Sequence, residues 1–210
     1  MKAPPRTNLL KTALALALAA PLFVNAESTF TTGAGSPITA SARLDFQVTV
    51  PKILFLQVGT GTAMASNATI NLITFTVPGA SLGNSTPIAA TATSGDLGNG
   101  VVTARVIGNN GNITFTSTTL GALGNGAGDT ISYAQISTTA STNTSATILA
   151  HPTLANGSTT TITLTPAAGK VINRDAKWTY SFLNQAVVPP GTYGGVNTNN
   201  GRVTYSASMP

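Results

Sequence analysis

The sequence is poor in the side chains that carry out chemistry. Its 210 residues include no Cys, one His and five acidic residues. Without Cys there is no disulfide, and with one His there is no ordinary zinc site. His151 precedes Pro152, and no Gly-x-Ser-x-Gly elbow occurs, so we expect a loop residue there and no catalytic base. The sequence therefore predicts a protein that is not an enzyme, with no catalytic, cofactor-binding or metal-binding residues and no cofactor.

The acidic residues are scattered, which disfavours the paired carboxylates of a glycosidase. Asp45 lies on the polar side of an alternating segment, and Asp96, Asp129 and Asp175 fall in separate polar stretches. Arg174-Asp175-Ala176-Lys177 is typical of a turn, so we expect a solvated ion pair there.

The N-terminus has the pattern of a signal peptide. Residues 1–11 are basic, an apolar run follows over residues 12–24, and Val24-Asn25-Ala26 supplies small or branched residues for cleavage. The run is well short of the roughly 20 residues that span a bilayer as a helix. We therefore expect residues 1–26 to be removed on export to the periplasm, the cell surface or beyond, with no membrane insertion afterwards.

The net charge of the chain becomes smaller when the predicted signal peptide is removed. Three of the ten basic residues lie within it, so seven cations then face five anions and the net charge of +5 drops to about +2. The remaining cations are dispersed, and a nucleic-acid partner is not expected because no basic patch is present.

Short alternating apolar runs dominate the rest of the chain. Residues 42–50 (Ala-Arg-Leu-Asp-Phe-Gln-Val-Thr-Val) alternate without error, and residues 177–182 and 202–207 do the same. Further strands are predicted over residues 53–58, 70–77, 88–93, 101–107, 113–117, 131–136 and 160–164. The pattern predicts an all-β, antiparallel sandwich, whereas a β-solenoid is disfavoured because no internal repeat is evident.

Turn residues and composition set the expected boundaries. Asn-Gly occurs at 99–100, 110–111, 125–126, 156–157 and 200–201, and the clearest predicted hairpin joins residues 101–107 to 112–117. Residues 27–41 are small and polar and are predicted to form a flexible arm. Residues 42–210 are predicted to form a single β-sandwich domain.

Trp178 has two interpretations. An exposed Trp would suit sugar stacking, but Trp178 alternates with Tyr180 and Phe182 on one strand face, which favours burial in the core.

Both ends of the chain carry motifs of a known kind. Residues 189–195 read Pro-Pro-Gly-Thr-Tyr-Gly-Gly, and residues 202–210 read Arg-Val-Thr-Tyr-Ser-Ala-Ser-Met-Pro. These resemble the ends of bacterial chaperone–usher pilus subunits and of spore-coat-U-like secreted proteins. Residues 44–51 followed by Ile53-Leu54-Phe55-Leu56 resemble the donor segment and first strand of such subunits. The chain departs from disulfide-bearing pilins in having no Cys, and it has extra residues at 27–41 and 195–200.

The resemblance implies an incomplete Ig-like β-sandwich that accepts a strand from a neighbour. It implies a fimbrial or surface-coat subunit whose partners are copies of itself or related subunits, with a periplasmic chaperone as a further partner. The candidate donor-strand face is Leu44, Phe46, Val48 and Val50.

Two alternatives stay open. Residues 42–50 could instead form an ordinary first strand that completes its own sheet. The protein could also be a self-contained secreted binding module without catalytic activity, for example for carbohydrate. The scarcity of charge favours assembly, because soluble monomers usually protect edge strands with charge or Pro.

Overall fold

The computed structural model describes residues 28–210, so the predicted signal peptide lies outside the described residues. The chain divides into a unit that ends at Val50 and a compact unit, Pro51–Pro210. Residues 42–50, predicted to begin the sandwich domain, belong to the first unit. Within residues 28–210, no helix has both the length and the apolar character needed to cross a membrane.

The described residues form short strands and two single-turn 3₁₀ helices, η1 (Gly79–Ser81) and η2 (Tyr133–Gln135). The strands are β1 (Leu54–Val58), β2 (Ile88–Ala89), β3 (Val101–Gly108), β4 (Ile113–Thr119), β5 (Leu123–Gly124), β6 (Thr130–Ile131), β7 (Ile136–Ser141), β8 (Thr159–Leu164), β9 (Ile172–Phe182) and β10 (Val203–Ser208).

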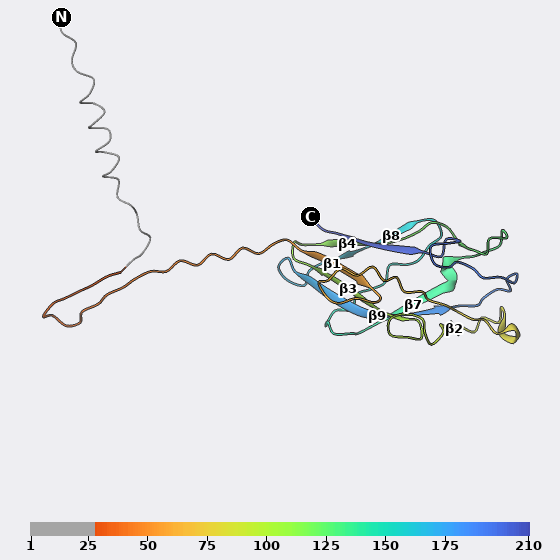
Figure 1. Cartoon of the computed structure of the whole chain (residues 1–210), viewed down its shortest axis with the longest axis horizontal. Helices are drawn as coiled ribbons and strands as arrows, with labels where there is room; N and C mark the ends of the chain where they lie inside the picture. Colours follow the sequence, from red (N-terminus) through yellow and green to blue (C-terminus); the bar gives the residue numbers. More distant parts are fainter. Residues whose placement is uncertain (1–27) are drawn as a thin grey trace, which may run out of the picture. The chain divides into compact units, whose positions relative to one another are not determined.

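The strands pair into antiparallel sheets, which confirms the predicted all-β sandwich. One sheet has the order β1-β3-β9-β2, and β7 pairs with β9. A second sheet has the order β10-β4-β8, and β5 and β6 form a small separate pair. Figure 1 shows β4 and β8 on one side of the compact unit and β1, β3, β9 and β7 on the other.

The core forms where the alternating faces of the two sheets meet. Every second residue of β3 is buried, and the buried positions of β4 include Ile113 and Phe115. Trp178 in β9 is fully buried and stacks on Phe115, and its indole N–H donates to the Leu149 carbonyl at 2.8 Å. The prediction that Trp178, Tyr180 and Phe182 face the core is confirmed.

The predicted hairpin over residues 101–117 is wrong. β3 pairs with β1 and β9, whereas β4 pairs with β10 and β8, so residues 109–112 carry the chain from one sheet to the other. The amide of Gly111, at a φ of 98°, donates to the Lys170 carbonyl within this crossing. Alternation shows which face of each strand is buried, but it does not show whether two successive strands pair or face each other across the core.

Three predicted strands are shorter than expected or absent. Residues 70–77 are extended and carry Ile73 and Phe75 against the core, but they form no ladder; Thr74 bonds only to Thr91 and Ser94. The strand predicted over 88–93 is limited to Ile88–Ala89, and that over 131–136 is interrupted by η2. In each case the apolar spacing is correct, but a continuous hydrogen-bonding partner is absent from the described residues.

The predicted solvated pair at residues 174–175 is also wrong. Asp175 lies within β9, is 1% exposed and pairs at 2.9 Å with Arg105 of β3. Its carboxylate also accepts the backbone N–H groups of Thr144 and Ser145. Burial alone would raise the pKa of Asp175, but the hydrogen bonds from Thr144, Ser145 and Arg105 outweigh burial and hold that pKa below its ordinary value.

Candidate functional site

The predicted donor-strand face is an exposed apolar stripe. Residues 42–50 are extended and belong to no strand of the described chain. Leu44, Phe46, Val48 and Val50 are between 72% and 86% exposed. The first strand of the sheet is β1, so the segment does not complete a sheet of this chain within residues 28–210. We call residues 42–50 the apolar arm.

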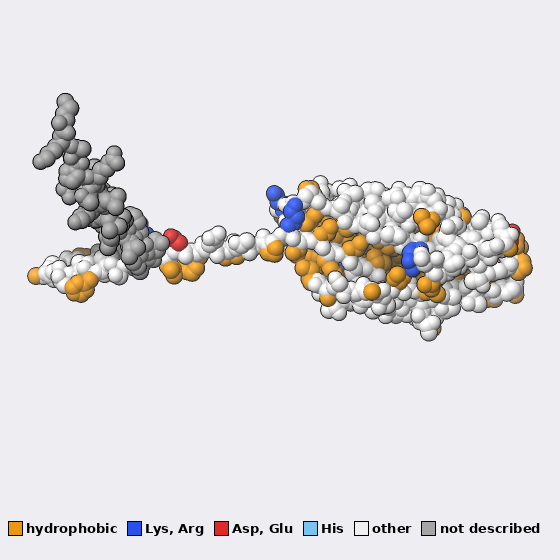
Figure 2. Space-filling view, turned by 45° about the horizontal axis from the view of Figure 1, so that its top comes forward, with side chains coloured by type: hydrophobic (Ala, Val, Ile, Leu, Met, Phe, Trp, Pro, Cys, Tyr) orange, Lys and Arg blue, Asp and Glu red, His pale blue; other side chains and the backbone are white. Residues whose placement is uncertain are grey.

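The compact unit has a seam between its first and last strands. Among the described residues, β1 pairs only with β3 and β10 pairs only with β4. Apolar side chains from both strands pack against the core while remaining only partly buried: Leu56, Val58, Tyr205 and Ala207, with Met209 just beyond β10. Figure 2 shows hydrophobic side chains gathered in a band along one face of the compact unit. The seam is therefore a surface where apolar side chains and two strand edges remain incompletely covered.

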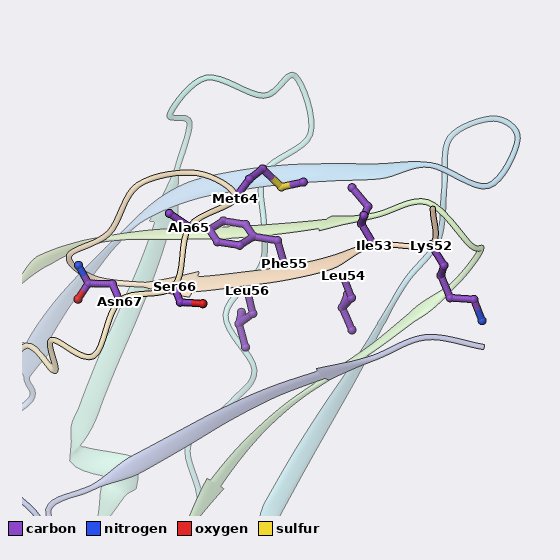
Figure 3. A pocket seen from close by; sticks show the side chains of 9 residues that line it. All are labelled: Lys52, Ile53, Leu54, Phe55, Leu56, Met64, Ala65, Ser66 and Asn67. Carbon is purple, nitrogen blue, oxygen red and sulfur yellow. The ribbon is translucent and has the colours of Figure 1, made fainter. Parts of the chain in front are cut away.

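A hollow of about 620 Å³ borders β1. Figure 3 shows Ile53 and Phe55 on the side of β1 that carries Met64 and Ala65, and Leu54 and Leu56 on the opposite side, toward β10. Both faces of β1 are thus lined by apolar side chains at a strand with an unpaired edge, which is unusual in a soluble monomer because such edges recruit other strands.

One direct bond, and side-chain bonds from residues 109 and 110 of the β3–β4 crossing, bring the start of β1 and the end of β10 together. Asn109 accepts the Ile53 N–H at 2.9 Å and donates to the Pro51 carbonyl at 2.8 Å. The Lys52 ammonium donates to the Pro210 carbonyl at 2.8 Å, as does the Asn110 amide at 2.5 Å. β1 therefore begins where β10 ends, and the two strands run in opposite directions along the seam. We call this end of the compact unit the base, and the end where β10 begins the tip.

A polar cluster that the sequence did not reveal lies beneath the seam. The Nε2 atom of His151 lies 2.6 Å from the Tyr205 hydroxyl and 3.1 Å from the Tyr180 hydroxyl, and the two hydroxyls are 3.0 Å apart. The imidazole also meets Trp178 edge-on, with the ring centroids 4.6 Å apart. His151 lies in a loop, as predicted, but residues 151, 180 and 205 are too far apart in sequence for their meeting to be inferred from any motif.

The cluster holds its histidine neutral. Burial lowers the pKa of His151 to about 4, although a hydrogen bond to the Pro152 backbone opposes that shift. Burial also raises the pKa of Tyr180 to about 12, and it raises the pKa of Tyr205 as well. In the neutral tautomer that carries its proton on Nδ1, the ring presents Nε2 as an acceptor for a tyrosine O–H. The arrangement joins β9, β10 and the loop at residue 151 by uncharged hydrogen bonds.

The structure brings together no metal-binding set from the described residues. No group of three or more His, Asp or Glu side chains is near enough to hold an ion within residues 28–210. Asp129 bonds to Asn125 at 2.8 Å, and Asp96 accepts the Thr103 N–H at 2.9 Å, so these carboxylates lie in separate loops.

Comparisons with protein-family models, with curated proteins and with solved structures found no match to this chain.

Proposed function

We propose that the protein is an exported structural subunit of a fimbria or surface coat that assembles by strand donation. The apolar arm of one copy fills the seam between β1 and β10 of another copy, and an incomplete Ig-like sandwich is completed in this way. The partner is a second copy of this chain.

One observation carries the proposal: four alternating apolar side chains of the arm are exposed, and the compact unit has an apolar seam whose two strand edges pair with no other strand of residues 28–210. Leaving four such side chains in water costs about 1.5–3 kcal/mol each relative to burial. An arm that inserts into the seam removes this cost and pairs its backbone with strand edges that would otherwise invite aggregation.

The arm and the seam also match in length. Leu44 to Val50 and Val203 to Met209 each cover seven alternating residues, or roughly 20 Å of extended chain. The inward positions of β10 are Val203, Tyr205, Ala207 and Met209, which are less exposed than the residues between them.

Side-chain size favours an antiparallel insertion beside β10. In that register Phe46 lies opposite Ala207 and Val48 lies opposite Tyr205, so each large side chain meets a smaller one. In the parallel register of equal length, Phe46 would meet Tyr205 and Val48 would meet Ala207, which crowds one position and leaves space at the other.

The strand order agrees with an Ig-like sandwich that lacks its last strand. Ig-like domains have sheets ordered A-B-E-D and G-F-C. In this proposal β1, β3, β9 and β7 take the places of strands A, B, E and D, and β10 and β4 take those of F and C, while no described strand takes the place of G beside β10. β2 beside β9 and β8 beside β4 are additional strands. An inserted arm would occupy that position.

Antiparallel insertion produces an open chain of subunits. Val50 would lie near the tip of the acceptor, so the compact unit of the donor would follow beyond that tip. The acceptor's own arm leaves from its base and is free to enter a third copy. Such a head-to-tail contact does not close on itself and generates a filament.

The alternative, a carbohydrate-binding module, depended on an exposed Trp178. Trp178 is fully buried and its N–H is bonded, so it offers no face to a sugar ring.

Single substitutions in the arm test the proposal. The full-length chain, exported from a bacterial host, is expected to form filaments that sediment and are visible by electron microscopy. Phe46→Arg is expected to reduce filament yield at least about a hundredfold, because a charge would enter an apolar seam. Gln47→Arg, one residue away on the outward side, is the matched control and should assemble normally. Equal assembly of the two variants, or a monomeric wild type, would refute strand donation.

A further inference from the structure

The described residues ahead of the apolar arm are not needed for strand donation. Seven residues, Leu44 to Val50, span the seam, and residues 28–41 precede them with Ala42 and Arg43 in between. This preceding segment is folded back on itself: the Thr29 hydroxyl donates to the Ser41 carbonyl at 2.7 Å and the Thr31 hydroxyl to the Thr39 carbonyl at 3.2 Å. Figure 1 shows its two limbs running side by side.

The segment carries apolar side chains and no charge. Phe30 is 91% exposed and Ile38 is also exposed, while the other side chains of residues 28–41 are small, polar or Pro. A doubled-back segment that exposes a Phe has an apolar face to cover.

The proposed register directs this segment to one end of the acceptor. With Leu44 beside Met209, residues 28–41 emerge at the acceptor's base, where Pro51, Asn109 and Pro210 come together. The base also exposes apolar side chains: Val171 is 59% exposed, and Leu54 is partly uncovered. Lys52 and Lys170 lie at the base, and residues 28–41 carry no charge that would repel them.

The lengths are compatible. Fourteen residues folded into two limbs reach roughly 20 Å, and the two sheets of a sandwich stack roughly 10 Å apart. The segment can therefore cross the base from the seam to the turn that contains Val171.

We propose that residues 28–41 of the donating copy form a clasp that packs Phe30 and Ile38 over the base of the acceptor, against Leu54 and Val171. This inference rests on the proposed strand donation and adds a second contact surface to it. The clasp lies at the point where the acceptor's own arm leaves for the next copy, so it reinforces each junction of the filament. Its occupant is a second copy of this chain.

Engineered cysteines can test the clasp by disulfide formation, and no natural cysteine interferes because the chain has no Cys. In the full-length chain, Ile38→Cys with Val171→Cys is expected to give disulfide-linked ladders of copies under mild oxidation. Each single-Cys variant is a control and can give dimers at most. Ile38→Cys with Val187→Cys, a position near the tip, is expected to give no ladder.

A second cysteine pair separates the two proposals. Asp45→Cys with Ser208→Cys reports the antiparallel insertion alone, because both side chains face outward in that register. Ladders from this pair without ladders from the 38–171 pair would overturn the clasp and leave donation standing. Absence of ladders from both pairs would overturn donation and the clasp together.

The packing of Phe30 and Ile38 in the clasp is tested separately, by the rate at which filaments dissociate. Phe30→Ser with Ile38→Ser is expected to leave the 45–208 ladder intact but to speed filament dissociation in urea by at least about tenfold, because two apolar side chains lose their burial. An unchanged dissociation rate would contradict a packing role for the segment.

Discussion

At the scale of single residues, the folded protein keeps its few ionisable groups in defined surroundings. His151 is neutral among two tyrosine hydroxyls and Trp178, and Asp175 is charged but surrounded by donors. Tyr205 belongs to both the seam and the histidine cluster. We therefore expect protonation of the imidazole to disturb the packing of β10.

Acid is expected to destabilise the protein through His151. The folded pKa of about 4 is lower than the ordinary value of 6.5, so the unfolded chain binds the proton more tightly. Stability is then complete above pH 6.5 and is lost as the pH falls toward 4. Between pH 7 and pH 5 the free energy of unfolding should fall by about 2 kcal/mol.

Urea denaturation of wild type and His151→Gln at both pH values measures this effect. The Gln side chain is neutral throughout and can accept a tyrosine O–H, so its free energy of unfolding should change little over the same range. Parallel pH dependences in the two proteins would show that another group is responsible.

At the scale of elements, β10 contributes a stripe whose smallest member is Ala207. In the proposed register this residue faces Phe46 of the inserted arm. Ala207→Phe should therefore block assembly, because two large side chains would compete for one position. Phe46→Ala should weaken assembly by leaving a cavity.

Combining the two changes in one chain is expected to restore assembly at least about tenfold over Ala207→Phe, as measured by light scattering after refolding. The smaller side chain introduced in the arm then makes room for the larger side chain introduced in β10 of the acceptor. Failure of the double variant to recover, with both single variants folded, would exclude this register.

The elements also show what could be predicted from the sequence. Period-two alternation correctly identified the all-β class and the buried face of β9. It could not reveal that β3 and β4 lie in opposite sheets, because alternation specifies a face and not a partner. The Asp175 cage and the His151 cluster depend on residues about 30 to 70 positions apart, which no local motif brings together.

At the scale of the whole molecule, the chain consists of a compact unit with an apolar seam and a segment with an apolar stripe of the same length. Exposing the seam or the stripe to water costs free energy. Because the two have the same length, each could cover the other. We expect the stripe and the seam to meet between copies of the chain.

The most direct measurement is the thermal unfolding of residues 51–210 with a peptide of residues 42–50, followed by the fluorescence of the buried Trp178. If strand donation occurs, the peptide raises Tm by several degrees, whereas the same peptide with Phe46→Arg has no effect. A sharp transition that neither peptide shifts would rule out strand donation, because the compact unit would then be complete without a donated strand.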